Sequence, residues 1–202
     1  MNTPRRHMLA TRRGLLLGVA AVAGVALAGC GDGDAPADSD GVDADYVSGD
    51  GSTTQWPPAA RTEPVELAGV SMAQEAIDLA QWRGAPVVLN FWYAACPPCR
   101  AEAPDLVALA QEFETDGVRF LGVNNTDGPQ TAQAFERTFE IPYPTLHDAD
   151  SAGVAAMQGL VPLQAVPTTV VLDAQGRPAA RILGIAERSI LAAMITAVLA
   201  ES

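Results

Sequence analysis

The 202-residue chain contains no lysine, so all 12 of its basic residues are arginines, and its 24 acidic residues give a formal net charge of −12. Binding to nucleic acid or to an anionic membrane surface needs clustered cations, and this balance argues against both. Cysteine is also scarce, with three residues in all. Three thiols are too few for a disulfide-scaffolded mini-protein or for a four-thiolate zinc or iron–sulfur site.

The apolar run from Gly14 to Gly29 has only 16 residues, which is short of the roughly 20 that span a bilayer. It follows an arginine-rich start without acidic residues, and this pattern predicts a signal peptide over residues 1–29. The run ends in Leu27-Ala28-Gly29-Cys30, which resembles a bacterial lipobox and implies lipidation of Cys30. Arg12 and Arg13 also fit a twin-arginine export signal. An uncleaved N-terminal anchor is the alternative.

Residues 30–60 begin with Cys30 and then carry seven aspartates among Gly, Ser, Ala and Pro, with no basic residue. Such a stretch has little apolar surface to bury, so we expect a disordered acidic tether. A calcium-binding loop is the alternative, but the stretch lacks the terminal glutamate and the flanking helices of such a loop. Residues 61–202 have the size of one domain.

Hydrophobic periodicity within residues 61–202 separates buried strands from amphipathic helices. Strands are expected at 86–92, 118–124, 168–172 and 178–183, with a short edge strand at 77–79 and a short strand or extended piece at 141–147. Helices are expected at 97–114, 130–139, 150–158 and 186–199. The last two strands flank the turn at 173–176 and should form an antiparallel hairpin. This order predicts an α/β sandwich with a mixed sheet.

Cys96 and Cys99 enclose two prolines at the junction between the strand at 86–92 and the helix that follows. A C-x-x-C in this context indicates a redox pair. The unpaired N–H groups and the positive end of the helix favour a thiolate on Cys96, and Pro98 suits a first helical turn. Cys99 should lie one turn further on, more buried than Cys96 and placed to resolve a mixed disulfide.

Two other uses of the pair are a zinc knuckle and a static structural disulfide. Zinc would need two more Cys or His ligands, and outside the predicted leader only Cys30 and His147 remain. A structural disulfide that closes so short a loop removes little chain entropy. Redox chemistry is therefore favoured, without a metal site, and His147 is expected to have a packing role.

The segment Asn90–Pro104 resembles the TlpA/ResA-like (AhpC/TSA-redoxin type) thiol-disulfide oxidoreductases of the thioredoxin superfamily, and the resemblance covers about residues 62–200. It includes Val166-Pro167-Thr168, which matches the cis-proline segment of the family, and Gly184 near the terminal hairpin. Residues 130–147 match the insertion typical of TlpA-like members. The resemblance implies a thioredoxin-like three-layer sandwich, with a mixed central sheet flanked by helices.

Individual roles follow from this resemblance. It implies that Cys96 is the attacking cysteine and that Cys99 is the resolving one. It implies a cis Pro167 beside the disulfide, with Val166 offering backbone hydrogen bonds to a substrate strand. Trp92 is a candidate for substrate binding, and a core position is the alternative for it.

The resemblance also implies that Glu102 tunes the pair, as the proton acceptor for the resolving thiol. Glu102 follows Cys99 by three residues, so both can lie on one face of the helix. A solvated glutamate in the first turn is the alternative. Asn90 stands where ordinary thioredoxins carry a buried carboxylate, which strengthens the case for Glu102. Ala95 stands where many relatives have Trp, and so an aromatic shield beside the disulfide is missing.

The implied protein is a thiol-disulfide oxidoreductase, lipid-anchored at the outer face of the cytoplasmic membrane. It would act as a protein-disulfide reductase or oxidase. Reduction is the favoured direction, including that of apocytochrome c disulfides during cytochrome c maturation, with electrons from a membrane thiol donor of the CcdA/DsbD type. We expect a monomer with no bound cofactor and no nucleic-acid partner. One alternative is a peroxiredoxin-like peroxidase, although Tyr93 replaces its usual threonine. The other is a Sco-like copper chaperone, which uses a wider cysteine spacing.

Overall fold

The computed structural model describes residues 51–162 and 165–201. The predicted signal peptide, Cys30 and the acidic stretch as far as residue 50 lie outside these residues. In the part of the chain that is described, no helix is both long and apolar enough to cross a membrane.

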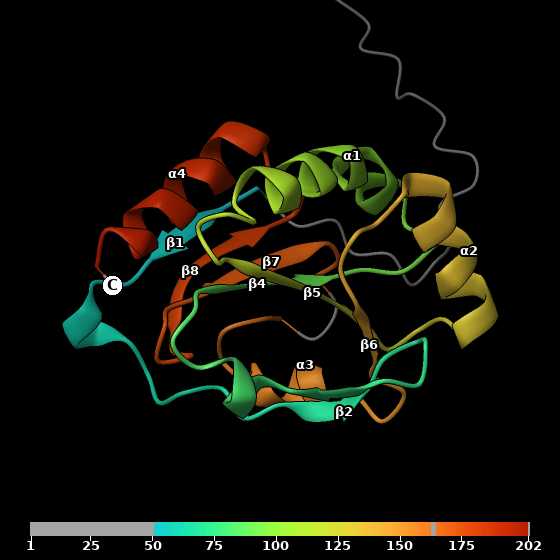
Figure 1. The fold of residues 1–202 in the computed structure, drawn as a ribbon, viewed down its shortest axis with the longest axis horizontal. Coiled ribbons are helices and arrows are strands. Elements are labelled where there is room, and N and C mark those ends of the chain that lie inside the picture. Colours follow the sequence, from blue (N-terminus) through green and yellow to red (C-terminus); the bar gives the residue numbers. More distant parts are fainter. Residues whose placement is uncertain (1–50, 163–164, 202) are drawn as a thin grey trace, which may run out of the picture. The chain divides into compact units, whose positions relative to one another are not determined.

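A mixed sheet forms the centre of the described domain (Figure 1). Its strands are β1 (Thr53–Gln55), β4 (Val87–Phe91), β5 (Arg119–Asn124), β6 (Thr145–His147), β7 (Thr168–Leu172) and β8 (Pro178–Leu183), in the spatial order β1-β8-β7-β4-β5-β6. β4, β5 and β6 run parallel, whereas β7 is antiparallel to both β4 and β8, and β1 is antiparallel to β8. The predicted strands and the terminal hairpin are confirmed, with bounds shifted by a few residues.

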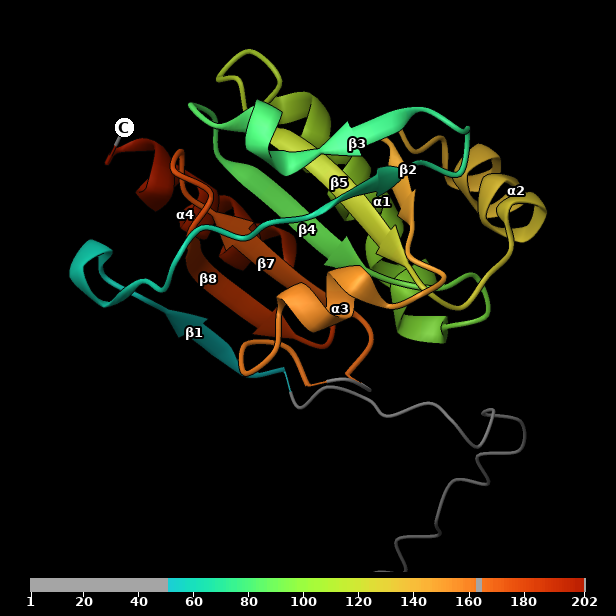
Figure 2. The same ribbon diagram turned by 90° about the horizontal axis from the view of Figure 1, so that it is seen from below.

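Helices cover both faces of this sheet. They are α1 (Pro97–Glu112), α2 (Pro129–Phe139), α3 (Ala152–Ala156) and α4 (Arg188–Leu199), with short 3-10 turns η1 (Pro58–Ala60) and η2 (Leu79–Trp82). α1 and α4 lie together on one face, and α3 lies on the other face with a ribbon of β2 (Ala68–Val70) and β3 (Ala76–Asp78) (Figures 1 and 2). This arrangement confirms the thioredoxin-like three-layer architecture.

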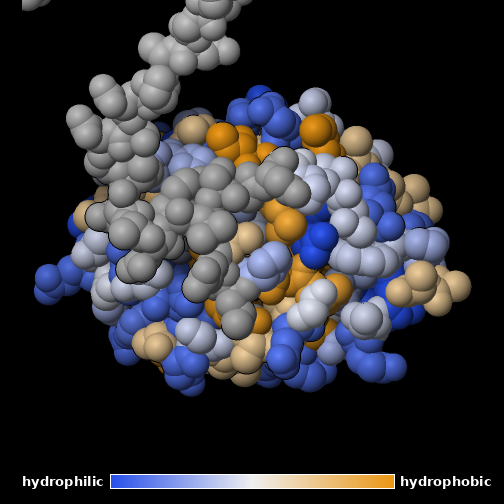
Figure 3. All heavy atoms as spheres, turned by 180° about the vertical axis from the view of Figure 1, so that it is seen from behind, coloured by the Kyte–Doolittle hydropathy of each residue, from blue (hydrophilic) through white to orange (hydrophobic). Residues whose placement is uncertain are grey.

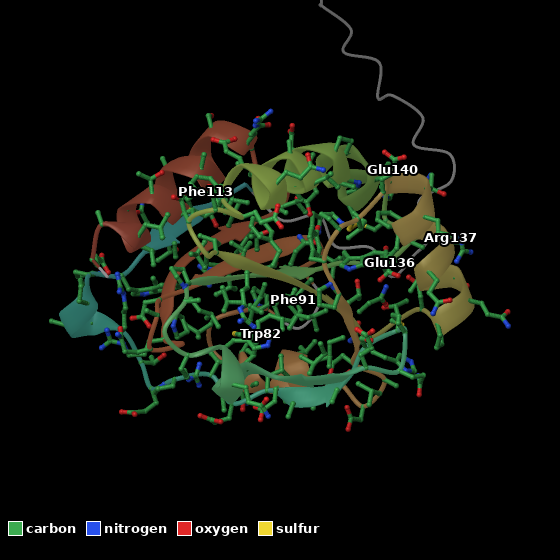
Figure 4. All side chains as sticks on the ribbon, in the orientation of Figure 1. Trp82, Phe91, Phe113, Glu136, Arg137 and Glu140 are labelled. Atoms are coloured by element: carbon green, nitrogen blue, oxygen red, sulfur yellow. A yellow bond between two sulfur atoms is a disulfide. The ribbon has the colours of Figure 1, made fainter. Side chains whose placement is uncertain are left out.

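Alternation along β4 divides its side chains between the two faces of the sheet. Val87, Leu89 and Phe91 join the core beneath β2, β3 and α3, whereas Val88 joins the core against α1 and α4. Because successive side chains point to opposite faces, Asn90 lies on the α1 side. Figure 4 shows Phe91 on the η2 side of the sheet and Phe113 near the α1–α4 layer. β4 is thus buried on both faces and places one polar residue beneath α1.

Residues 53–60 fall within the segment predicted as a tether, but they contain β1 and η1 of the described domain. Thr53–Gln55 forms β1, and Thr54 lies opposite Arg181 of β8. The Trp56 N–H donates to the carbonyl of Ala179 at 2.8 Å. Three polar residues are too few to show a hydrophobic periodicity. This strand forms by pairing with the edge of β8, so its sequence alone does not predict it.

The short edge strand predicted at 77–79 forms as β3, but it pairs with β2 in a separate two-stranded sheet.

Large apolar side chains are seldom exposed in the described ranges, and the exceptions are Val70, Ile185 and Ile190. In Figure 3 hydrophilic and hydrophobic residues are interspersed on the face seen from behind.

Candidate active site

The two cysteines lie at the N-terminus of α1, where strand β4 leads into the helix. Cys96 is the N-cap residue, and Cys99 follows in the first turn with a Cα–Cα distance of 5.3 Å between them. The two are joined by a disulfide, and the Cys99 N–H donates to Cys96 Sγ at 3.2 Å. The prolines between them occupy the first helical positions, where no backbone donor is needed. The helix N-terminus therefore carries the pair, as predicted.

Both cysteines are buried in the disulfide form, since Cys96 is 0% exposed and Cys99 is 2% exposed. The expectation that Cys99 would be the more buried of the two is therefore wrong. Both belong to a cluster whose other members are apolar side chains from four segments: Met72, Trp92, Ala103, Ala132 and Phe135. Cys96 is buried because α2 and the segment at Met72 pack against it. The prediction considered only the position of Cys96 on α1 and did not include these neighbours.

Trp92 lies in this core cluster and is 5% exposed. Its ring contacts that of Phe135 with centroids 4.3 Å apart, and Phe135 in turn contacts Phe139 at 4.5 Å. The guanidinium of Arg100 lies 5.1 Å from the centre of the Phe139 ring. The core position considered as the alternative for Trp92 is thus the one observed, and a role of Trp92 in substrate binding stays a prediction.

Glu102 is 1% exposed, which excludes the alternative of a solvated glutamate. One carboxylate oxygen accepts from Asn90 Nδ2 at 2.8 Å, and the other accepts from the Ala186 N–H at 2.8 Å. Asn90 also donates to Thr169 Oγ1 at 3.2 Å. Asn90 and Thr169 are opposite each other in the β4–β7 register, so the sheet presents both beneath α1.

Burial raises the pKa of Glu102 to about 7, against the opposing effects of the hydrogen bonds from Ala186 and Asn90, and the charge of Asp105 raises it further. A carboxyl group with this pKa can accept or release a proton near neutral pH. Cys99 and Glu102 are one turn apart on the buried face of α1. The resolving thiol and a titrating carboxyl group therefore share one side of the same helix.

A cavity of about 10 Å³ adjoins Cys99 and is lined also by Asn90, Leu106 and Tyr143. This volume is close to the space needed for one water molecule. Tyr143 comes from the segment before β6, and burial, with the charges of Glu102 and Glu136, raises its pKa. No role for Tyr143 is predictable from the sequence, because its approach to α1 depends on how α2 returns the chain to the sheet.

The Val166–Pro167 peptide bond is cis, as the resemblance implies. The Pro167 carbonyl accepts from the Gly184 N–H at 2.8 Å, and Gly184 has a positive φ of 89°. Thr168 Oγ1 donates to the Ala165 carbonyl at 2.6 Å. Val166 packs against the cluster that holds the cysteines. The cis-proline segment and the cysteine pair therefore lie beside the same cluster.

Asp127, from the loop between β5 and α2, was not expected at the site. Its Oδ2 accepts from the Ala94 N–H at 2.6 Å and from Asn124 Nδ2 at 2.8 Å. β4 and β5 are parallel neighbours, so their carboxyl ends meet at one edge of the sheet. The polar run 124–127, which begins at the last residue of a buried strand, was the signal that could have revealed Asp127.

His147 lies in β6 opposite Asn124 of β5, and it is half-buried. Among the residues at 51–162 and 165–201, no three His, Cys, Asp or Glu side chains come close enough together to hold a metal ion.

Residues 61–178 match the model of the AhpC/TSA family. The thiol:disulfide interchange protein HelX of Rhodobacter capsulatus is 37% identical over 127 residues, which are 63% of this chain and 65% of HelX. The thiol-disulfide oxidoreductase ResA of Halalkalibacterium halodurans is 33% identical over 102 residues, which are 50% of this chain and 56% of ResA.

Among solved structures, a secreted thiol-disulfide isomerase from Corynebacterium glutamicum superposes with a TM-score of 0.69 and 30% identity. The match covers 77% of this chain and 96% of the isomerase. The chain spans a smaller share of the curated relatives, at 56% and 65% of the lengths of ResA and HelX.

Proposed function

Because the chain belongs to the AhpC/TSA family, we propose that it is a thiol-disulfide oxidoreductase that exchanges disulfides with protein substrates through Cys96 and Cys99. One observation carries this proposal: the Cys96–Cys99 disulfide at the N-terminus of α1, one turn from the buried Glu102. HelX, ResA and the C. glutamicum isomerase are described as a thiol:disulfide interchange protein, a thiol-disulfide oxidoreductase and a thiol-disulfide isomerase, which supports the same chemistry.

In the reductive direction the Cys96 thiolate attacks one sulfur of the substrate disulfide, and the other substrate sulfur leaves as a thiolate. The Cys99 thiol then loses its proton to the Glu102 carboxylate. The Cys99 thiolate attacks Cys96 Sγ, forms the Cys96–Cys99 disulfide and expels the second substrate thiolate. Two electrons pass from the cysteine pair to the substrate, and a donor dithiol restores the pair by the same steps in reverse.

Three features of the fold support these steps. The N-terminus of α1 stabilises the Cys96 thiolate through its backbone N–H groups and dipole. Burial gives Glu102 a pKa of about 7, which suits a proton acceptor at neutral pH. Val166, before the cis Pro167, offers backbone groups to a substrate strand, which would lie beside the cluster that holds both cysteines.

The place and partners of the protein are part of the same proposal. Lipidation at Cys30 would anchor the chain to the outer face of the cytoplasmic membrane, with the acidic residues after Cys30 as a tether. The substrates would be protein disulfides, including those of apocytochrome c, and a membrane thiol donor would supply the electrons. The apolar run at Gly14–Gly29 and the lipobox-like ending support export and anchoring, and the isomerase from C. glutamicum is described as secreted.

The proposal is tested by following the reduction of insulin by the purified protein with dithiothreitol as electron source. We expect turnover by the wild type and none by Cys96→Ser, while circular dichroism shows that the variant remains folded. Peroxide consumption is measured in parallel. Consumption of peroxide that survives replacement of Cys99, without insulin reduction, would establish a peroxidase in place of the proposed activity.

A further inference from the structure

Ala94, two residues before Cys96, has both its N–H and its carbonyl held by charged side chains from different elements. The N–H donates to Asp127 Oδ2 at 2.6 Å, and the carbonyl accepts from Arg100 Nη1 at 3.2 Å. Asp127 precedes α2, whereas Arg100 lies in the first turns of α1. The loop that leads into Cys96 is thus fixed from two sides.

The carboxylate of Asp127 is itself held in place by the end of β5. Its Oδ2 accepts from Asn124 Nδ2 at 2.8 Å, and Asn124 Oδ1 accepts from the N–H of Asp127 at 2.9 Å. Asn124 is 0% exposed. These reciprocal bonds tie the carboxylate to a buried strand end, so that Asp127 can hold the Ala94 peptide in one position.

Side-chain packing fixes only part of this loop: Tyr93 and Ala94 pack against the cluster that holds the cysteines, whereas Ala95, next to Cys96, is exposed. Backbone hydrogen bonds remain, and one of them runs from the Cys96 N–H to the Tyr93 carbonyl at 3.2 Å. Cys96 must stay at the N-cap for its sulfur to receive the Cys99 N–H. The hydrogen bonds to the Ala94 peptide therefore help to keep Cys96 where the helix N-terminus can stabilise its thiolate.

We propose that Asp127 is a positioning residue for disulfide exchange, which keeps Cys96 at the N-cap of α1 by holding the Ala94 peptide. The inference rests on the proposed function, in which Cys96 is the attacking thiol. Arg100 holds the other side of the same peptide. A carboxylate that acted through its charge alone would oppose a nearby thiolate, whereas one that acts through this hydrogen bond favours it.

The other charged and titratable groups on the segments around Cys96 are the same in Asp127→Ala and in Asp127→Asn. Apart from Asp127 they include Tyr93 in the loop before Cys96, Glu75 near Met72, Cys99, Arg100, Glu102 and Asp105 on α1, Glu136 and Arg137 on α2, Tyr143 before β6, and Glu187 after β8. Two variants that differ only at Asp127 therefore report on that residue.

The test compares Asp127→Ala with Asp127→Asn. Both variants lack the charge, but the asparagine oxygen can still accept from the Ala94 N–H. The pKa of Cys96 in the reduced protein is read from the pH dependence of iodoacetamide alkylation, with Cys96 identified by peptide mass mapping. We expect a higher Cys96 pKa in Asp127→Ala than in Asp127→Asn, and a kcat/KM for insulin reduction at pH 7 that is about tenfold lower, as about one pKa unit implies.

Asp116→Ala is the matched control, because Asp116 is exposed and no side-chain hydrogen bond is seen for it among the described residues. It should behave as the wild type. Equal Cys96 pKa and kcat/KM values in Asp127→Ala and Asp127→Asn would overturn the inference. If Asp127→Ala does not fold, Arg100→Ala against Arg100→Gln makes the same comparison at the Ala94 carbonyl, with the same expected order.

The failure of this inference is distinguishable from failure of the proposed function. Insulin reduction that persists in Cys96→Ser refutes the proposed function whatever the Asp127 variants do. Loss of activity in Cys96→Ser, together with identical Asp127→Ala and Asp127→Asn, refutes only the positioning role.

Discussion

Replacement of Glu102 by Gln should change how the stability of the oxidised protein depends on pH. Burial raises the Glu102 pKa from its ordinary value of 4.5 to about 7. Between these values the native state holds a proton that the unfolded state has released, so stability falls as pH rises through this window. The difference between the two pKa values corresponds to about 3 kcal/mol of free energy of unfolding.

Glutamine cannot ionise, so the variant escapes this loss. It has a single acceptor oxygen for the two donors that now meet Glu102, Asn90 Nδ2 and the Ala186 N–H. An unmatched buried donor costs about 1–3 kcal/mol. Relative to the wild type, Glu102→Gln should therefore be less stable by about 1–3 kcal/mol near pH 4.5, and equal or more stable above pH 7.

The measurement is urea unfolding of oxidised wild type and variant from pH 4.5 to 8.5. Other titrating groups cancel in the difference between the two proteins, which should change by about 3 kcal/mol across the range. Glu114→Gln, which removes an exposed carboxylate, is the control for the substitution itself. A difference between Glu102→Gln and wild type that stays constant with pH would refute a raised pKa at Glu102.

Two further predictions follow from the hydrogen bonds and ion pairs. Asn90→Ala removes a donor to the Glu102 carboxylate, so the pKa of Glu102 should rise further. The pH–rate profile of insulin reduction should therefore move to higher pH, and a move to lower pH would contradict this. Arg61→Ala removes a buried cation that pairs with Asp173 and Glu201. Asp173 keeps its bonds to Arg177, so the free energy of unfolding should fall by about 1–3 kcal/mol at pH 7, and an unchanged urea midpoint would refute that role.

Elements with a strong local pattern could be predicted from the sequence. The apolar runs that became β4 and β7 are buried on every residue, and a strand covered on both faces needs such a run. β1 was missed because three mostly polar residues become a strand only by pairing with β8. β2 was missed for a similar reason, since it is short and exposed throughout and forms by pairing with β3.

The site shows the same division. Cys96, Cys99 and Glu102 are close in sequence, so the C-x-x-C motif and helical spacing predicted their proximity. The burial of Cys96 and the approach of Asp127 to Ala94 depend on neighbouring segments that only the tertiary structure brings together. Their distance along the chain hides such contacts from a local analysis.

The central claim is that substrate disulfides are attacked by Cys96 and that Cys99 resolves the product. Mass spectrometry of reduced Cys99→Ser and Cys96→Ser, each mixed with a protein disulfide substrate, tests it most directly. Cys99→Ser should accumulate a one-to-one mixed disulfide through Cys96, which dithiothreitol reduces, and Cys96→Ser should accumulate none. A stable adduct through Cys99 in Cys96→Ser, with none in Cys99→Ser, would contradict the account.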